Sequence, residues 1–294
     1  MNFQDFIKNI ECKTQLYMGK EYEICIQKVT KNNGVELTGI MAKKEGASTF
    51  PTIYIDDLYE ENMTMEDVEY AAMKLSRNLS KVENNLMFDI GRFTNYELAK
   101  DRIALKLINA DKNKALLFEI PHRRFHNLAI VYYYLLPEEL SDGIASVLIR
   151  NTHMENWGID EKTLYEIAYE NSRQYFKMKV WTMGEMISEL YGSDLLEEDF
   201  PMYVISNENK INGSFYMIYE DELKQLSDKF GKSFYILPSS IHELILMPDD
   251  GNKNEKDLLC TVTEINHTQV QEEEILADSV YYYDKDKNEV YWLC

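Results

Sequence analysis

The segment SFYILPSSIHELILMPDDG, residues 233–251, gathers side chains that could catalyse hydrolysis. Ser240, His242 and Glu243 supply the hydroxyl, imidazole and carboxylate of a Ser-His-acid triad, in which the acid must orient the imidazole. If residues 241–247 form a strand, His242 and Glu243 point to opposite faces. If Ser240 opens a helical turn, Ser240 and Glu243 form a capping box with backbone N–H groups. In neither geometry can Glu243 orient His242. The pattern therefore favours a turn, and His242 and Ser240 stay catalytic candidates only with a carboxylate from elsewhere.

The segment PHRRFH, residues 121–126, is the densest cluster of basic and imidazole side chains in an acidic chain. His122 and His126 have the i,i+4 spacing of two metal ligands on a short helix, but Arg123 replaces the glutamate of an H-E-x-x-H zinc site. A cation there opposes a metal, so we predict no metal site. Two interpretations stay open. One is a basic turn before the next strand, with arginines paired to the protein's own carboxylates. The other is an anion or ligand site made by His122, Arg123, Arg124 and His126.

The segment RNTHMENWG, residues 150–158, lies between a predicted strand and a predicted helix. Binding residues are frequent in such loops, so His153 joins the candidate ligand-binding residues. The asparagines and glycine of a loop entering a helix explain the segment equally well.

Cofactor motifs are missing from the sequence. Neither G-x-G-x-x-G nor G-x-x-x-x-G-K-[ST] occurs, so we expect no nucleotide cofactor. Asp56 and Asp57 follow a predicted strand and could hold Mg²⁺, but a solvated acidic loop is the alternative.

The elements that must position these residues follow from hydrophobic periodicity and turn signals. Asn33 and Gly34 predict a hairpin turn because both tolerate positive φ. Helices are predicted at residues 2–17, 64–79, 94–109, 160–173, 182–192, 220–231 and 255–269. Strands and hairpins are predicted at residues 22–44, 51–56, 128–136 with 144–151, 202–219, 244–247 and 279–293.

A hairpin followed by a helix recurs three times, at about residues 22–80, 128–173 and 202–230. No residue-level identity links the copies, so the recurrence is architectural. It predicts an α+β fold with mainly antiparallel sheets built from hairpin-plus-helix units. We expect an N-terminal α-β-β-β-α domain at residues 1–85 and a C-terminal α+β domain at residues 86–294.

The formal net charge is −20, and residues 174–294 hold 10 lysines, no arginine and 24 Asp or Glu. Such a surface repels nucleic acid phosphates and anionic lipid, so we expect neither as a partner. The N-terminus does not have the pattern of a signal peptide, and no run of 18 apolar residues occurs. None of the four cysteines lies in CxxC spacing. These features predict a soluble cytoplasmic protein with reduced thiols.

Seven segments together resemble an uncharacterised family of proteins from anaerobic Firmicutes that is classed as a domain of unknown function. The segments are KNNGVELTGI, PTIYIDDLYEE, IPHRRFHNLAIVYYYLL, ENWGI, YVISNENKINGSFYMIY, FYILPSSIHELILMPDD and ADSVYYYD. The resemblance covers nearly the whole chain. It implies a cytoplasmic bacterial protein of a kind that mobile elements can carry. It brings no known activity, so no catalytic residue is carried over.

A protein-binding or regulatory module is the function that the sequence favours. The many tyrosines and methionines suit adaptable contact surfaces, and the motifs for catalysis are weak. Two alternatives remain. One is a hydrolase or metal-dependent enzyme with a histidine-containing cleft, and the other is an acidic nucleic-acid mimic that inhibits a defence protein.

Overall fold

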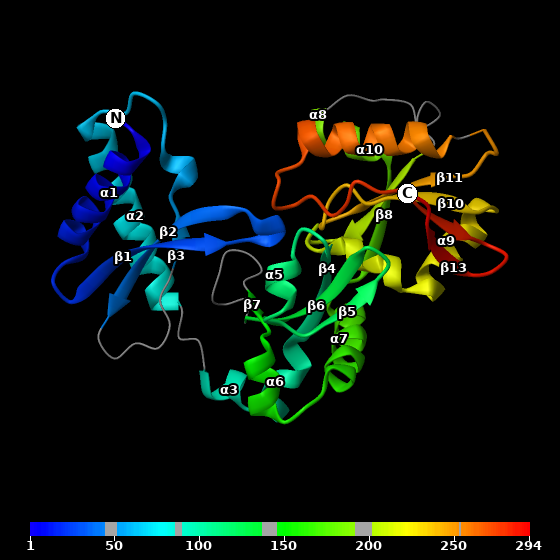
Figure 1. The fold of residues 1–294 in the computed structure, drawn as a ribbon, viewed down its shortest axis with the longest axis horizontal. Coiled ribbons are helices and arrows are strands. Elements are labelled where there is room, and N and C mark those ends of the chain that lie inside the picture. The colour runs from blue at the N-terminus through cyan, green and yellow to red at the C-terminus, as the bar shows by residue number, and fades with distance from the viewer. Residues whose placement is uncertain (45–51, 86–89, 137–145, 192–201, 253) are drawn as a thin grey trace. The chain divides into compact units, whose positions relative to one another are not determined.

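The computed structural model describes residues 1–44, 52–85, 90–136, 146–191, 202–252 and 254–294. They form an α+β protein with three antiparallel sheets, which confirms the predicted fold class (Figure 1). The chain divides into two compact units. Unit 1 comprises Met1–Phe93 and Leu135–Val147, and unit 2 comprises Thr94–Tyr134 and Leu148–Cys294. The predicted division into domains at residues 85 and 86 stays a prediction. No helix in the described ranges is long and apolar enough to cross a membrane.

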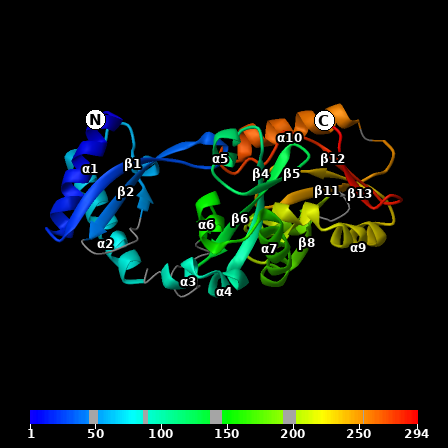
Figure 2. The ribbon, with the colours of Figure 1, turned by 60° about the horizontal axis from the view of Figure 1, so that its bottom comes forward.

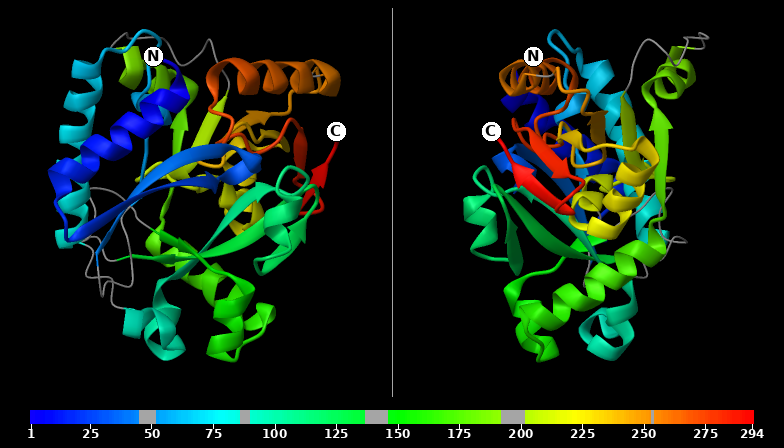
Figure 3. Two further views of the ribbon diagram at one scale, coloured as in Figure 1. Left: turned by 60° about the vertical axis from the view of Figure 1, so that its left-hand side comes forward. Right: turned by 90° about the vertical axis from the view of Figure 1, so that its right-hand side faces the viewer.

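Unit 1 packs two helices on one face of a three-stranded sheet with the order β1-β2-β3 (Figure 3). Phe6 and Ile10 of the first helix and Val68 and Ala72 of the second are fully buried against Ile40 of the sheet. Its elements are α1 (Phe3–Met18), β1 (Tyr22–Thr30), β2 (Glu36–Lys44), β3 (Thr52–Tyr54) and α2 (Met65–Asn85).

Local signals in unit 1 act as predicted. Asn33 and Gly34 adopt φ values of 60° and 76° in the turn between β1 and β2. Thr64 and Asp67 bond reciprocally, with the backbone N–H of each donating to the side chain of the other, at the start of α2. The hairpin and the capped helix are therefore confirmed.

The first sheet of unit 2 has the strand order β4-β6-β5, and β7 also pairs with β6. Helix α7 packs along β4, where the Oγ of Ser172 accepts a hydrogen bond from the backbone N–H of Leu105 at 2.9 Å (Figure 2). This contact satisfies a donor on an edge strand that would otherwise stay unpaired. The elements are β4 (Ile103–Asn109), α5 (Lys114–Leu117), β5 (His122–Phe125), β6 (Leu128–Leu135), β7 (Ser146–Leu148), α6 (Asn151–Trp157) and α7 (Glu161–Tyr175).

The helix predicted at residues 94–109 is wrong. Residues 90–102 form short helical segments, α3 (Ile90–Thr94), α4 (Tyr96–Ala99) and a 3-10 turn Lys100–Arg102, and residues 103–109 form the buried strand β4. Both faces of β4 are covered, so its apolar residues run almost continuously. Such a run cannot be told from a buried helix by periodicity alone.

The second sheet of unit 2 has the order β13-β12-β10-β11-β9-β8 (Figure 1). Helix α10 covers one face, where Leu258 and Val262 pack with Tyr235. The opposite face carries Phe230 of α9 against Phe234. The elements are β8 (Met178–Thr182), α8 (Met183–Tyr191), β9 (Tyr203–Asn207), α9 (Glu220–Phe230), β10 (Phe234–Leu237), β11 (Leu244–Pro248), α10 (Glu255–Gln269), β12 (Tyr281–Asp284) and β13 (Glu289–Trp292).

The hairpin predicted at residues 202–219 is also wrong. Only β9 forms there, between β8 and β11, and Gly213–Ile218 folds as a 3-10 helix. Tyr216 and Tyr219 explain the difference, because both rings are buried and their hydroxyls donate to the carbonyls of Phe176 and Tyr169. The hairpin-plus-helix unit therefore holds for the first two copies and fails in the third.

Candidate functional site

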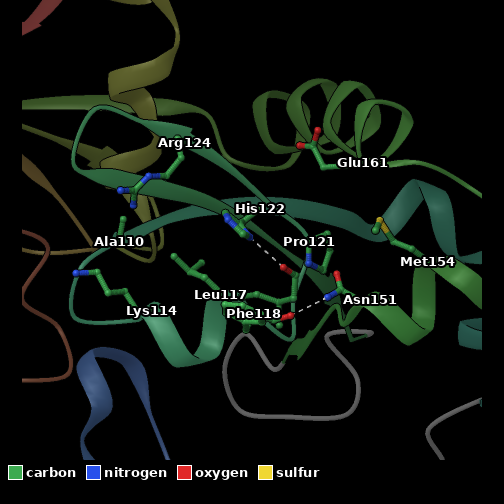
Figure 4. Close-up of a pocket in the computed structure, with 11 residues that line it drawn as sticks. Ala110, Lys114, Leu117, Phe118, Pro121, His122, Arg124, Asn151, Met154 and Glu161 are labelled. Carbon is green, nitrogen blue, oxygen red and sulfur yellow. Dashed lines mark hydrogen bonds between the residues drawn. The ribbon is translucent and has the colours of Figure 1, made fainter.

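A cavity of about 740 Å³ opens in unit 2 beside strand β5, and we call it the β5 pocket (Figure 4). Strand β5 and helices α5 and α6 supply most of its wall, and the first residue of α7 completes it. The lining residues are Ala110, Lys114, Leu117, Phe118, Ile120, Pro121, His122, Arg124, Asn151, Met154 and Glu161.

Strand alternation explains why two basic side chains meet an apolar wall. His122 and Arg124 are two residues apart on β5, so they share a face, opposite Val131 and Ala129 of β6. That face belongs to an apolar cluster of Ile108, Ala110, Leu117, Ile120, Ala129 and Val131. In Figure 4, Arg124 and Lys114 lie on one side of His122, and Asn151 and Met154 lie on the other.

His122 has one ring nitrogen engaged by the backbone. Its Nδ1 lies 3.1 Å from the carbonyl oxygen of Ile120, and a carbonyl can only accept, so Nδ1 carries the proton. The second ring nitrogen, Nε2, has no hydrogen-bond partner in the described part of the chain. His122 therefore presents Nε2 to the pocket, where it can accept a proton or a hydrogen bond.

Arg124 differs from its neighbour Arg123. Arg123 pairs with Glu161 at 2.9 Å and lies 3.7 Å from the ring centroid of Tyr165. Arg124 is exposed on the pocket side, and across the described ranges its guanidinium has neither an ion pair nor a hydrogen bond. The prediction of arginines paired with the protein's own carboxylates is thus confirmed for Arg123, whereas for Arg124 the described residues include no such pair.

The other two charged groups of the pocket have partners. Lys114 pairs with Asp111 at 3.0 Å on the surface. Glu161 binds Arg123 and accepts a hydrogen bond from the hydroxyl of Tyr132, whose pKa is raised by burial and by this carboxylate. Among the charged lining residues, Arg124 is therefore the one that has no ion-pair partner in the described part of the chain.

His126 and His153 lie outside the wall of the β5 pocket. His126 occupies the turn between β5 and β6 with a φ of 53°, and its ring contacts Phe125 and Tyr281. The short helix with His122 and His126 as i,i+4 ligands is wrong, because β5 is a strand. His153 is on α6, where its Nδ1 accepts from the backbone N–H of Arg150 at 3.1 Å. Burial lowers the pKa of His153, and the nearby Arg150 adds to this shift.

His242 lies in the connection between β10 and β11, where both of its ring nitrogens have partners. Its Nδ1 accepts from the backbone N–H of Asn212 at 3.2 Å, and its Nε2 lies 3.4 Å from Glu274. The backbone carbonyl of His242 accepts from the Oγ of Ser206 at 2.6 Å and from the N–H of Gly213 at 2.9 Å. The carboxylate at His242 is therefore Glu274, not Glu243.

Ser240 has a structural contact instead of a catalytic one. It is buried, its Oγ accepts from the backbone N–H of His242 at 3.0 Å, and it forms an isolated bridge with Ile275. The helical turn predicted from Ser240 does not form, because Ser240 is held in this bridge and Ile241 and His242 form a bend before β11. In the part of the chain that the structure describes, no hydroxyl bonds to the His242 ring. Ser240, His242 and Glu274 therefore lack the contact that a triad requires.

The electrostatics of His242 favour its neutral form. Burial lowers its pKa, the carboxylate of Glu274 opposes this shift, and Lys106 reinforces it. A neutral ring that accepts at Nδ1 must carry its proton on Nε2, which points it toward Glu274.

Metal ligands do not gather within the described ranges, where no group of three or more His, Cys, Asp or Glu side chains could hold an ion. Asp56 instead accepts hydrogen bonds from the backbone N–H and the hydroxyl of Thr38, at 2.6 and 3.1 Å. The structure therefore does not support the alternative of a Mg²⁺ site at Asp56 and Asp57.

Several pocket residues have no individual signal in the sequence. Lys114, Leu117 and Phe118 belong to a short helical turn, and Asn151 and Met154 belong to α6. Phe118 is 92% exposed, although its sequence neighbours Leu117 and Ile120 are buried. Two segments mark this part of the molecule in advance, PHRRFH for β5 and RNTHMENWG for α6.

Comparison with known proteins places the chain in a family without giving it an activity. No curated protein matches it, and no solved structure matches it. The model of one family of unknown function, DUF5688, matches residues 3–285. The predicted whole-chain family resemblance is thus confirmed, whereas the source in anaerobic Firmicutes stays a prediction. The chain belongs to the DUF5688 family of unknown function.

Proposed function

We propose that this protein is a binding module whose ligand enters the β5 pocket. The observation that carries the proposal is an apolar cavity of about 740 Å³ into which one uncompensated guanidinium and one free imidazole nitrogen project. Ligand pockets of proteins are usually of this size, apolar in most of their wall and equipped with few polar groups. Arg124 and His122 supply the polar groups here.

A catalytic role finds less support. The imidazole with a carboxylate partner, His242, has both ring nitrogens occupied, and the imidazole with a free nitrogen, His122, is oriented by a carbonyl. General base catalysis needs a positioned base within reach of a nucleophile. Neither imidazole ring has a hydroxyl or thiol among its described contacts. We therefore prefer binding to hydrolysis.

The proposal is tested with a neutral, solvatochromic apolar dye. We expect saturable binding at one site per chain, and loss of that binding in Met154→Trp, because the indole fills the cavity between α6 and β5. Thermal unfolding of the variant checks its folding, and Met202→Trp adds the same side chain outside the pocket. Dye binding that is unchanged in Met154→Trp, or that is not saturable in the natural protein, overturns the proposal.

A protein partner is the second candidate, as the sequence predicts. The observation that favours it is Phe118, 92% exposed at the rim of the β5 pocket, since exposed aromatic side chains are enriched at protein interfaces. In affinity purification, a stoichiometric partner should be lost in Phe118→Ser. The same partner should be retained in Tyr175→Ser, which removes another exposed ring. Equal recovery with both variants rules out a contact at Phe118.

The nucleic-acid mimic receives less support than either candidate. Some carboxylates of residues 174–294 bind the protein's own lysines. Asp228 pairs with Lys224 at 2.6 Å and with Lys285 at 3.7 Å, and Asp284 pairs with Lys287 at 3.3 Å.

We also propose a cytoplasmic location for the protein. The four cysteines are free, and reduced thiols are typical of that compartment.

A further inference from the structure

We infer that the ligand of the β5 pocket is an apolar monocarboxylate, such as a medium-chain acyl acid. Its carboxylate binds Arg124 and His122, and its apolar body lies against Leu117 and Met154. This inference rests on the proposed function and goes further, because it assigns the chemistry of the ligand.

The charged side chains of the pocket wall indicate the charge of the ligand. Of the charged side chains that line the pocket, Lys114 is paired with Asp111 and Glu161 with Arg123, at 3.0 and 2.9 Å. Arg124 has no ion-pair partner among the described residues, in a chain whose net charge is −20 and which offers many carboxylates. A ligand with one negative charge compensates Arg124.

The geometry of the polar groups selects a carboxylate. A guanidinium presents parallel N–H donors that match the two oxygens of a carboxylate. His122 lies two residues away on the same face of β5, with Nδ1 fixed by the carbonyl of Ile120 at 3.1 Å and Nε2 free. When both ring nitrogens carry protons, Nε2 donates to the same carboxylate.

A phosphate dianion fits less well. Its second charge requires a second cation, and the closest candidate in the wall, Lys114, already pairs with Asp111. The acidic surface of the protein adds repulsion that grows with the charge of the ligand. A monoanion therefore matches the pocket better than a dianion.

The apolar part of the wall indicates the remainder of the ligand. Leu117, Ile120 and Pro121 are buried, and Met154 of α6 lines the same pocket. Methionine adapts its shape to the ligand that it contacts, which suits an unbranched chain. Burial of each CH₂ group contributes about 0.8 kcal/mol, so the chain supplies most of the affinity.

The test is calorimetric titration of the full chain with three ligands of equal length: octanoate, octanol and octylamine. We expect octanoate to bind at one site and octylamine not to bind. Charge-assisted hydrogen bonds contribute roughly tenfold to a hundredfold in affinity, so Arg124→Gln should weaken octanoate binding by that factor and leave octanol unchanged. Arg102→Gln is the matched control, because it removes the same charge from a residue outside the pocket wall.

Failure of the inference can be distinguished from failure of the proposed function. Equal binding of octanoate and octanol, or equal weakening in Arg124→Gln and Arg102→Gln, overturns the inference while dye binding preserves the function. Absence of binding by the dye and by all three ligands overturns both. Inorganic phosphate that competes with octanoate in the natural protein but not in Arg124→Gln overturns the selection of a monocarboxylate.

Discussion

His122 and His242 are two imidazoles in one unit with opposite surroundings. His122 has one nitrogen bound to a carbonyl and the other open to a cavity, beside Arg124, which has no ion-pair partner within the described ranges. His242 has both nitrogens bound, by Asn212 and Glu274, and its own carbonyl accepts two further hydrogen bonds. A side chain with every polar atom satisfied stabilises the fold, whereas one with a free atom at a cavity can bind a ligand. We therefore assign structure to His242 and binding to His122.

The largest effect should come from crowding the connection that holds His242. An added Cβ at Gly213 would lie 2.4 Å from the Oγ of Ser206 and 2.6 Å from the carbonyl oxygen of His242. Overpacking of this kind costs up to about 3 kcal/mol, so Gly213→Ala should lower the free energy of unfolding by that amount. Chemical denaturation measures it. Gly231→Ala, where the added Cβ has open space, should lose only about 1 kcal/mol from its positive φ. Equal losses would refute the steric account.

Removal of each imidazole compares the two histidines directly. His242→Ala leaves the N–H of Asn212 without its acceptor, which should cost about 1–2 kcal/mol of unfolding free energy. His122→Ala should cost less, about 0.5 kcal/mol, because it loses only the part-buried hydrogen bond from Nδ1 to the carbonyl of Ile120. The same denaturation assay measures both variants. If His122→Ala is the more destabilising, the assignment of the two roles is reversed.

The stability supplied by His242 should depend on pH. Burial lowers its pKa from the usual 6.5, so the unfolded chain takes up protons that the folded chain refuses. The contribution is therefore complete above about pH 6.5 and is lost as pH falls through the lower pKa of the folded protein. The advantage of the natural protein over His242→Ala should shrink between pH 7 and pH 5.

Comparison of these two proteins isolates His242 because they share the other titrating groups, among them Glu243, whose pKa burial raises. Glu274 and Lys106 also face His242, with opposite effects on its pKa. An advantage that is constant across this pH range would contradict a buried, neutral His242.

The smallest expected effect is the contribution of His122 to octanoate affinity. His122→Ala should weaken octanoate binding by a few-fold, because one hydrogen bond contributes about 0.5–1.5 kcal/mol. Calorimetric titrations of the natural protein and His122→Ala measure the change. Equal octanoate affinity in both proteins would remove His122 from the binding site.

Local signals in the sequence predicted much of the fold. Asn33 and Gly34 determine a turn by their tolerance of positive φ, and Asp160 caps α7 by accepting from the N–H of Thr163. These features depend on residues within a few positions of one another. Strand β4 was not predicted, because its run of apolar residues is equally compatible with a buried helix. Only its pairing with β6 makes it a strand.

The candidate site could be located from the sequence but not understood from it. The composition of PHRRFH marks the place, yet nothing local shows that Arg123 meets Glu161 and that Arg124 meets none of the carboxylates that the structure describes. That difference arises from strand alternation and from the position of α7, whose Glu161 lies 38 residues after Arg123 in the sequence. In the same way, Glu274 lies far from His242 in sequence and reaches it only after folding.

The most direct test of the central claim is the NMR signal of the Met154 methyl group during titration with octanoate. Met154→Leu assigns the signal among the fourteen methionines. We predict a saturable shift of this methyl with octanoate, its loss in Arg124→Gln, and no shift with octylamine. A Met154 signal that stays unmoved while octanoate binds elsewhere would contradict a carboxylate site in the β5 pocket.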